Sequence, residues 1–175
     1  MVEQQQATHD WSKFMFDQLY EGGIRIFAHI PDAGNDRLIH YAGQQDDTQV
    51  VLLTTEEEGI AICAGVDLAH QRGILCMQSS GLGNCVNYLS LVKAGKFPLL
   101  MMITMRGDYG EQNPWQYPMG AAVEDVLETM GVSIYKIEQA SDVDVAVQGA
   151  LHATAAGAQA AAIVVGQKFL GAKAF

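Results

Sequence analysis

The stretch that decides the fold is GILCMQSSGLGNCVNYLSL, residues 73–91. Its first six residues form a continuous apolar run, which is typical of a strand buried on both faces of a sheet. Residues 79–84 (SSGLGN) are small and polar and predict a loop, and a segment of helical periodicity follows at 84–94. The stretch therefore predicts a strand, a tight loop and a helix, which is how a βαβ unit begins.

The same alternation runs through the chain. Apolar runs predict further strands at 24–30, 49–54, 98–104, 132–137 and 161–165, and helical periodicity predicts helices at 9–22, 35–42, 56–71, 121–130 and 141–156. Alternating strands and helices predict an α/β fold, a three-layer open parallel sheet of about six strands with helices on both faces. With no repeat and no linker, the 175 residues are expected to form one domain, 1–175.

Composition excludes several classes of protein. The net charge of −10 lacks the basic stripe that a nucleic-acid partner requires. The polar start lacks the basic and apolar regions of a signal peptide, and no apolar run is long enough to span a bilayer, so we expect a cytoplasmic protein without a membrane partner. Cys63, Cys76 and Cys85 lie in apolar surroundings without metal-ligand spacing and are expected to be reduced core thiols, with no metal site in the chain.

Polar loops follow the strands at the edge where ligands bind in such sheets. They are HIPDAGND, TTEEEG, MQSSGLGN and MRGDYGEQNPWQYPMG. The glycines of SSGLGN permit close approach of another group, which favours either a ligand or a capped turn. The loop lacks a P-loop lysine, and no His/Asp pair can be assigned to Ser80 as in a hydrolase.

Three acids, Glu56, Glu57 and Glu58, open a predicted helix. The helix dipole alone could account for all three, because carboxylates are stabilised at a helix N-terminus. Successive helical residues point about 100° apart, so at most two of them can face the polar edge. A carboxyl that faces an apolar cleft there could share a proton with a buried base.

Taken together, HIPDAGND, TTEEEGIAICAGVDLA, MQSSGLGNCVNYLSL and MRGDYGEQ resemble the pyrimidine-binding domain of thiamine diphosphate-dependent 2-oxo acid decarboxylases. The resemblance is to the sulfopyruvate and phosphonopyruvate decarboxylase branch and runs from about residue 12 to 170. It implies the same α/β fold. It also implies a carboxyl that hydrogen-bonds the cofactor's aminopyrimidine and so helps to form the thiazolium ylide that attacks a 2-oxo acid.

The resemblance carries roles to particular residues. Aligning Gly65 and the Leu68-Ala69 pair places the functional acid on Glu56, with Glu57 open if the helix start shifts by one; Glu58 fits the alignment less well, although it precedes a glycine as in the phosphonopyruvate enzymes. The residues implied to lie against the pyrimidine are Gln78, Ser80, Gly81 and Asn84. Turn formation or capping is the alternative for each of them.

The diphosphate-binding motif of the family does not occur in these 175 residues. The family binds diphosphate and Mg²⁺ through Gly-Asp-Gly and a distant Asn, and RGDYGEQN at 106–113 lacks the second glycine and the spacing. The resemblance therefore implies an α-type chain that shares thiamine diphosphate with a β subunit, which supplies diphosphate and Mg²⁺ binding, in an α/β hetero-oligomer. The chain alone is expected to be inactive.

Four other residues have two readings each. Arg106 suits a substrate carboxylate, sulfonate or phosphonate, or an ion pair with Asp108 or Glu111. His29 could handle protons or contact substrate, or be structural. Trp115 and Tyr117 are expected in an ordered loop that covers the cleft or contacts the partner.

Three methionines, Met101, Met102 and Met105, continue an apolar run and are expected in the core.

Separate small subunits favour 3-sulfopyruvate, giving sulfoacetaldehyde, as the substrate that the resemblance implies; phosphonopyruvate or another 2-oxo acid stays open. Asn84 and Arg106 are the expected substrate contacts, and Glu56 and His29 the expected catalytic groups. Two other classes of function are alternatives to a decarboxylase subunit: a non-catalytic scaffold of the same fold and a nucleotide-binding α/β domain. The lack of a phosphate-loop lysine speaks against the second.

Overall fold

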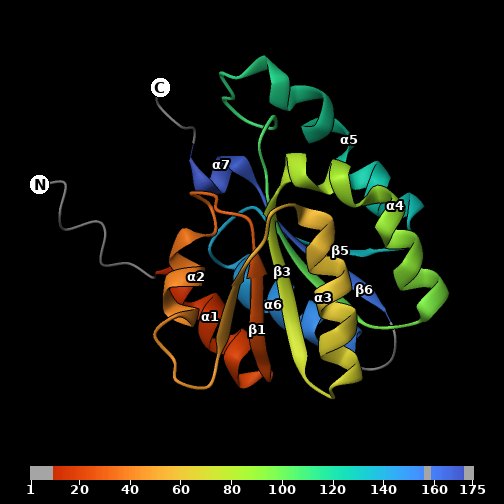
Figure 1. Ribbon diagram of the computed structural model, residues 1–175. Helices are drawn as coiled ribbons and strands as arrows, with labels where there is room; N and C mark the ends of the chain where they lie inside the picture. Colours follow the sequence, from red (N-terminus) through yellow and green to blue (C-terminus); the bar gives the residue numbers. More distant parts are fainter. Residues whose placement is uncertain (1–9, 156–158, 172–175) are drawn as a thin grey trace, which may run out of the picture.

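A computed structural model describes residues 10–155 and 159–171 (Figure 1). Its elements are α1 (Trp11–Glu21), β1 (Ile24–His29), α2 (Asp36–Ala42), β2 (Gln49–Leu52), α3 (Glu56–Leu68), β3 (Arg72–Gln78), α4 (Ser79–Gly95), β4 (Leu99–Thr104), η1 (Pro114–Gln116), α5 (Tyr117–Thr129), β5 (Ser133–Ile137), α6 (Asp142–Ala155), β6 (Ala160–Val165) and α7 (Gln167–Leu170). Position 9 of the first predicted helix, position 156 of the last and the polar N-terminal segment lie outside the described residues.

All six strands form one parallel sheet in the order β2-β1-β3-β4-β6-β5. β4 and β6, in the middle, are buried along their whole length, as continuous apolar runs require. β2, at one edge, is mostly exposed and has only four residues. The predicted α/β class, with six parallel strands, is confirmed.

Two hydrophobic cores lie on the two faces of the sheet (Figure 1). Helices α1, α2 and α6 cover one face, and α3, α4 and α5 cover the other. The connection from β1 through α2 moves outward to β2, whereas the connection through α3 crosses back over β1 to β3. The chain leaves β1 toward α2 on one face and leaves β3 toward α4 on the other, and in sheets of this kind the ligand crevice is expected between the carboxyl ends of two such strands.

The prediction of a loop at residues 79–84 is wrong. Gln78 is still extended, but α4 begins at Ser79 and takes both glycines into its first turns. Glycine is unfavourable in a helix by about 1 kcal/mol relative to alanine, which is why the local sequence indicates a loop. Packing overrides this preference, because Gly81 lies directly against the side chain of Glu56 on α3.

The other differences lie at element ends. Helix α5 begins at Tyr117, four residues before the predicted start, and Trp115 lies in the short η1 helix rather than in a loop. The short helix α7 was not predicted. Three cysteines are free and buried, and burial raises the pKa of Cys63 to about 12, so the prediction of inert core thiols is confirmed.

Core methionines also match the prediction: Met101, Met102 and Met105 are buried. Over residues 10–155 and 159–171, no helix is both long enough and apolar enough to cross a bilayer.

Candidate active site

Glu56, the first residue of α3, extends its carboxyl group to the first turns of α4. Asn84 Nδ2 donates a 2.8 Å hydrogen bond to Glu56 Oε2. A Cβ atom built on Gly81 would stand 2.4 Å from Glu56 Oε1 and 2.5 Å from Glu56 Cγ, so only glycine leaves room for the carboxyl group. The packing of α3 against α4 thus places this acid over a glycine and beside an amide.

The two following acids point elsewhere. The hydroxyl of Thr55 donates to Glu57 Oε2, which lowers the pKa of Glu57. Glu58 Oε2 accepts a 2.9 Å hydrogen bond from the backbone N–H of Thr54 and so closes the first turn of α3. Of the three acids that the sequence offers, Glu56 is the one whose carboxyl group bonds to a residue of α4.

Asp32 joins the ends of three strands at the crevice between β1 and β3. Its Oδ1 accepts a 3.1 Å hydrogen bond from Gln78 Nε2, and its Oδ2 accepts one of 2.7 Å from Thr104 Oγ1. The backbone N–H of Gly34 donates to Oδ2 as well, at 2.9 Å. Ser80 Oγ donates to Gln78 Oε1 at 2.8 Å and extends the network to α4.

His29, at the end of β1, lies beside a cavity of about 400 Å³ that Pro31, Asp32 and Asn35 also line. The Nδ1 atom of His29 and the Oδ1 atom of the buried Asn35 are both buried, and neither has a hydrogen-bond partner in the described residues. Burial lowers the pKa of His29, so the neutral imidazole is favoured. Two buried polar atoms without a described partner thus belong to residues that line this cavity.

Arg106 forms a buried ion pair with Glu111. Arg106 Nε donates to Glu111 Oε2 at 2.6 Å and Arg106 Nη2 donates to Glu111 Oε1 at 2.8 Å. The Glu111 side chain is 0% exposed, and that of Arg106 is 11% exposed. Of the interactions that the sequence suggested for Arg106, the structure contains the ion pair with Glu111, and this pair is buried rather than at the surface. The pair uses two of the five N–H donors of this guanidinium and leaves the other three outside it.

Glu111 organises the loop after β4. Its carboxylate also accepts hydrogen bonds from the backbone N–H groups of Gly107, Gln112 and Asn113, and from Gln167 Nε2 at 3.0 Å. These donors, Arg106 first, hold the pKa of Glu111 well below its usual range. The segment RGDYGEQN is thus a carboxylate-centred loop, which presents an exposed Trp115 just beyond it.

The structure brings the predicted site residues together in two groups. Glu56, Gly81 and Asn84 form the first, and Gln78 and Ser80 join Asp32 in the second. In the described residues, no hydrogen bond links His29 or Arg106 to Glu56. Sequence reasoning assigned no role to four polar residues of these networks: Asp32, Asn35, Thr104 and Gln167. Asp32 and Asn35 stand in HIPDAGND, a motif that the sequence had singled out by its position after the first strand.

The fold and the site define a class of α/β domain that binds ligands at the carboxyl edge of a parallel sheet. A solved structure of the same fold is 2-oxoglutarate:ferredoxin oxidoreductase from Magnetococcus marinus, with a TM-score of 0.64 and 14% identity over 89% of this chain and 28% of that chain. At this level of identity the likeness shows the fold alone.

Sequence comparison identifies the family. The chain is 35% identical over 125 residues to the sulfopyruvate decarboxylase subunit alpha of Methanococcus maripaludis, covering 71% of this chain and 75% of that protein. It is 32% identical over 108 residues to the phosphonopyruvate decarboxylase of Streptomyces viridochromogenes, covering 61% and 27%. No family model matches the sequence. The chain belongs to the family of sulfopyruvate decarboxylase alpha subunits.

Proposed function

We propose that this chain is the α subunit of a two-chain, thiamine diphosphate-dependent decarboxylase that converts 3-sulfopyruvate into sulfoacetaldehyde and carbon dioxide. Family membership supports the reaction class. The observation that carries the mechanism is the carboxyl group of Glu56, which α3 presents at the carboxyl edge of the sheet and which Asn84 and Gly81 hold in one position.

The residues around Glu56 fit the pyrimidine end of this cofactor. A carboxyl group is the hydrogen-bond partner that a pyrimidine ring nitrogen needs, and the exposed Asn84 leaves the start of α4 open to an approaching ring. When bound, thiamine diphosphate supplies the carbon nucleophile and accepts the electrons left by the departing carbon dioxide. The chain supplies orientation and a proton-holding group.

Glu56 is proposed to hold a proton at Oε1 against the ring nitrogen, because Oε2 already accepts from Asn84. Asn84 is then a positioning residue for the carboxyl group rather than a contact of the cofactor or the substrate. Gln78 and Ser80 are proposed to position Asp32, since their hydrogen bonds lead to it. His29 and the cavity beside it are proposed to receive the substrate end, with a neutral imidazole.

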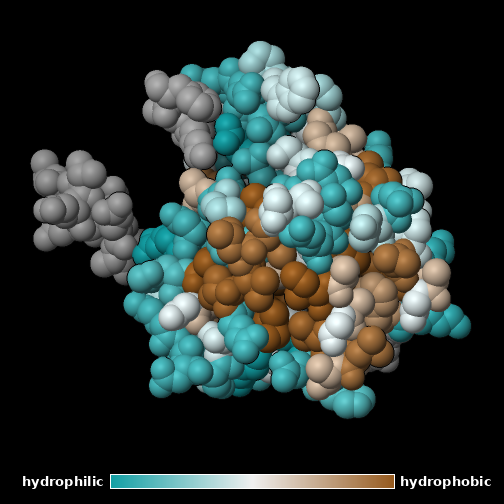
Figure 2. Space-filling model, in the orientation of Figure 1, coloured by the Kyte–Doolittle hydropathy of each residue, from teal (hydrophilic) through white to brown (hydrophobic). Residues whose placement is uncertain are grey.

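A β subunit is proposed to complete the site by binding the diphosphate and Mg²⁺, in an α/β hetero-oligomer, with residues 1–175 as the single pyrimidine-binding domain. Figure 2 shows apolar side chains gathered across the face that carries α3. Leu52 on β2, Leu68 on α3 and Leu91 on α4 are more than half exposed. Exposed apolar patches of this kind mark protein-protein contact sites, so we propose that the partner covers this face.

The substrate is tested by a reconstitution assay. Carbon dioxide release from 3-sulfopyruvate, 3-phosphonopyruvate and pyruvate is measured with this chain, with a candidate β chain, and with both, in the presence of thiamine diphosphate and Mg²⁺. Activity in the mixture alone, with 3-sulfopyruvate preferred, is the expected result. Preference for 3-phosphonopyruvate would change the substrate and keep the mechanism. A stable two-chain complex without cofactor binding would favour the non-catalytic scaffold.

Replacement of Gly81 by Ala is expected to reduce the reconstituted activity by about 100-fold, because misplacing a reacting group by about 1 Å costs that much. The new Cβ would overlap Glu56 Oε1 and push the carboxyl group aside. Initial rates at saturating substrate measure the effect.

Gly83→Ala is the matched control. A Cβ at position 83, on the same helix, would meet only the sulfur of Met119 at 3.3 Å. Its rate should stay close to that of the unsubstituted protein. Equal losses of activity in the two variants would mean that adding a Cβ atom to either glycine disturbs α4 itself, independently of the position of Glu56.

A further inference from the structure

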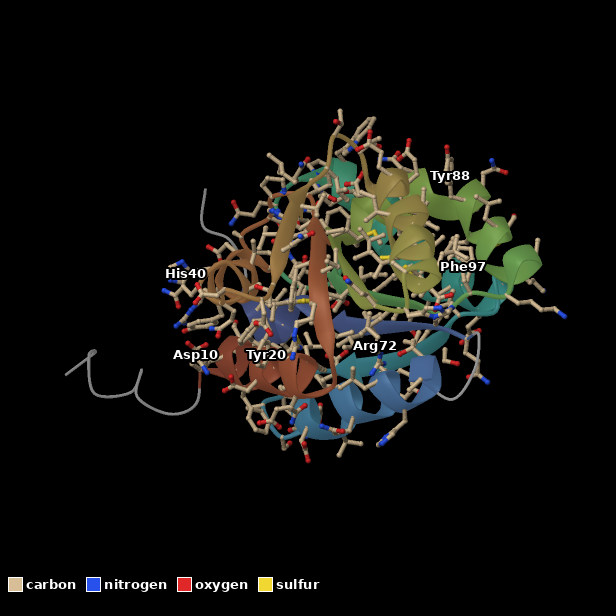
Figure 3. All side chains as sticks on the ribbon, turned by 60° about the horizontal axis from the view of Figure 1, so that its bottom comes forward. Asp10, Tyr20, His40, Arg72, Tyr88 and Phe97 are labelled. Carbon is tan, nitrogen blue, oxygen red and sulfur yellow. The ribbon has the colours of Figure 1, made fainter. Side chains whose placement is uncertain are left out.

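A second cavity, of about 540 Å³, opens at the amino edge of the sheet, opposite the edge that carries Glu56. Ile24 at the start of β1, Arg72 at the start of β3 and Pro98 before β4 line it, together with the ends of α3 and α6. Figure 3, turned so that this edge comes forward, shows Arg72 between the sheet and α6. The volume lies in the range of about 300–1,000 Å³ that small-molecule sites occupy.

Arg72 differs from the other arginines of the described chain. Its guanidinium donates to the backbone oxygens of Gly22 and Leu151, the latter at 3.0 Å, and to Thr154 Oγ1 at 3.1 Å. These bonds satisfy carbonyl groups at the ends of α1 and α6. The other arginines each pair with a carboxylate: Arg25 with Asp47, Arg37 with Asp10 and Arg106 with Glu111.

Arg72 therefore brings a half-buried positive charge to the cavity without a carboxylate to neutralise it in the described residues. A guanidinium has five N–H donors, and the three hydrogen bonds leave two of them for another partner. The carbonyl groups of the helix ends disfavour an anion. Arg72 satisfies those of Gly22 and Leu151, and backbone N–H groups of residues 69–71 satisfy those at the end of α3.

Two more nitrogen-bearing side chains line the same cavity, Lys96 after α4 and His70 after α3. Both residues have left-handed backbone conformations, with φ of 53° at Lys96 and 56° at His70. Lys96 forms no ion pair within residues 10–155 and 159–171. Asp67 is the single acid among the lining residues. The charge of this cavity is therefore positive in a chain whose net charge is −10.

We propose that this cavity binds a small anion that carries a phosphate, sulfonate or carboxylate group. Arg72 offers its two remaining N–H donors, one on Nε and one on Nη1, to such oxygens, and Lys96 adds a charge at the rim. Asp67 lines this cavity near the end of α3, and Glu56 is the first residue of the same helix. A change at Asp67 could therefore alter activity through α3, so the test measures anion binding and not activity.

The test is isothermal titration of the full chain with inorganic phosphate, and in parallel with succinate, at constant ionic strength. Saturable binding is expected. Lys96→Gln should weaken it about three- to fivefold, the effect of removing one exposed charge, and Asp67→Asn should tighten it by a similar factor. Lys93→Gln is the matched control, because Lys93 is a neighbouring lysine on α4 that lines a different cavity.

Opposite effects of the Lys96 and Asp67 variants, with no effect of the Lys93 variant, would support the site, and the ratio of the phosphate and succinate affinities would name its preferred group. Absence of saturable binding of either anion would overturn the proposal. So would equal weakening by Lys96→Gln and Lys93→Gln, since that is the result of diffuse attraction to a positive surface. Circular dichroism of each variant verifies that the fold is retained.

Discussion

Glu56→Gln is expected to lower the turnover of the reconstituted enzyme by about 10²–10⁴-fold, the range that a general acid or base contributes. The change keeps the shape of the side chain, and the amide oxygen of glutamine can still accept the hydrogen bond from Asn84. What is lost is the group that holds a proton against the ring nitrogen. Turnover is measured as carbon dioxide release at saturating 3-sulfopyruvate, cofactor and partner subunit.

Glu57→Gln is the matched control, since it removes the same charge from the same turn of α3. Its carboxyl group bonds to Thr55 and has no bond to α4, so a change of less than about threefold in turnover is expected. If Glu57→Gln abolished turnover and Glu56→Gln did not, the role would belong to Glu57. If neither variant mattered, neither Glu56 nor Glu57 would hold the role, and Glu58 would be the one acid of this turn left to test.

Glu111→Gln is expected to destabilise the fold by about 3–5 kcal/mol, the usual cost of removing one partner from a buried ion pair. The variant would leave the guanidinium of Arg106 without a charge to pair with. Its amide NH2 would also oppose either the backbone N–H of Gly107 or those of Gln112 and Asn113, depending on which oxygen it replaces. The free energy of unfolding in urea measures the loss.

Glu124→Gln is the control for this prediction. The pair between Lys136 and Glu124 has the same 2.6 Å nitrogen-oxygen distance as that between Arg106 and Glu111, but its side chains are 47% and 48% exposed. A cost below about 1 kcal/mol is expected, because water screens an exposed pair. Equal costs for the two variants would show that burial does not decide the strength of these ion pairs.

The buried pair between Arg106 and Glu111 makes the free energy of unfolding depend on pH. The pKa of Glu111 is lowered in the folded state, so its contribution is complete above the unfolded value of about 4.3 and is lost as the pH falls below it. We expect the free energy of unfolding to fall between about pH 5 and pH 3 in the unsubstituted protein, and to fall less in Glu111→Gln. Parallel pH dependences would contradict this assignment.

Much of the fold followed from local sequence patterns. Strands such as β4 and β6 are apolar at every position because both faces of the sheet are covered, so they can be read from composition alone. The start of α4 could not be read in this way. Its two glycines argue against a helix by intrinsic preference, and contact with Glu56 on another helix is what explains Gly81.

The segments that form the candidate site could be predicted from the sequence, but the contacts between their side chains could not. The acids at the start of α3 and the small residues after β3 were visible as motifs. The acid that bonds to Asn84 is decided by the rotation of α3 relative to α4, and no local sequence pattern predicts this rotation. Asp32 was missed as an organising residue, because its partners Gln78 and Thr104 lie 46 and 72 residues away along the chain.

The sequence by itself determined the layers of this protein, the parallel sheet and the edge at which polar residues gather. The reason is that burying six apolar strands and connecting them by right-handed crossovers leaves few arrangements. Only the tertiary structure decided that Glu56 lies over Gly81, that Arg106 faces inward to Glu111 and that Arg72 faces a cavity at the opposite edge. Each of these results depends on the distance between elements that are far apart in the chain, and packing sets that distance.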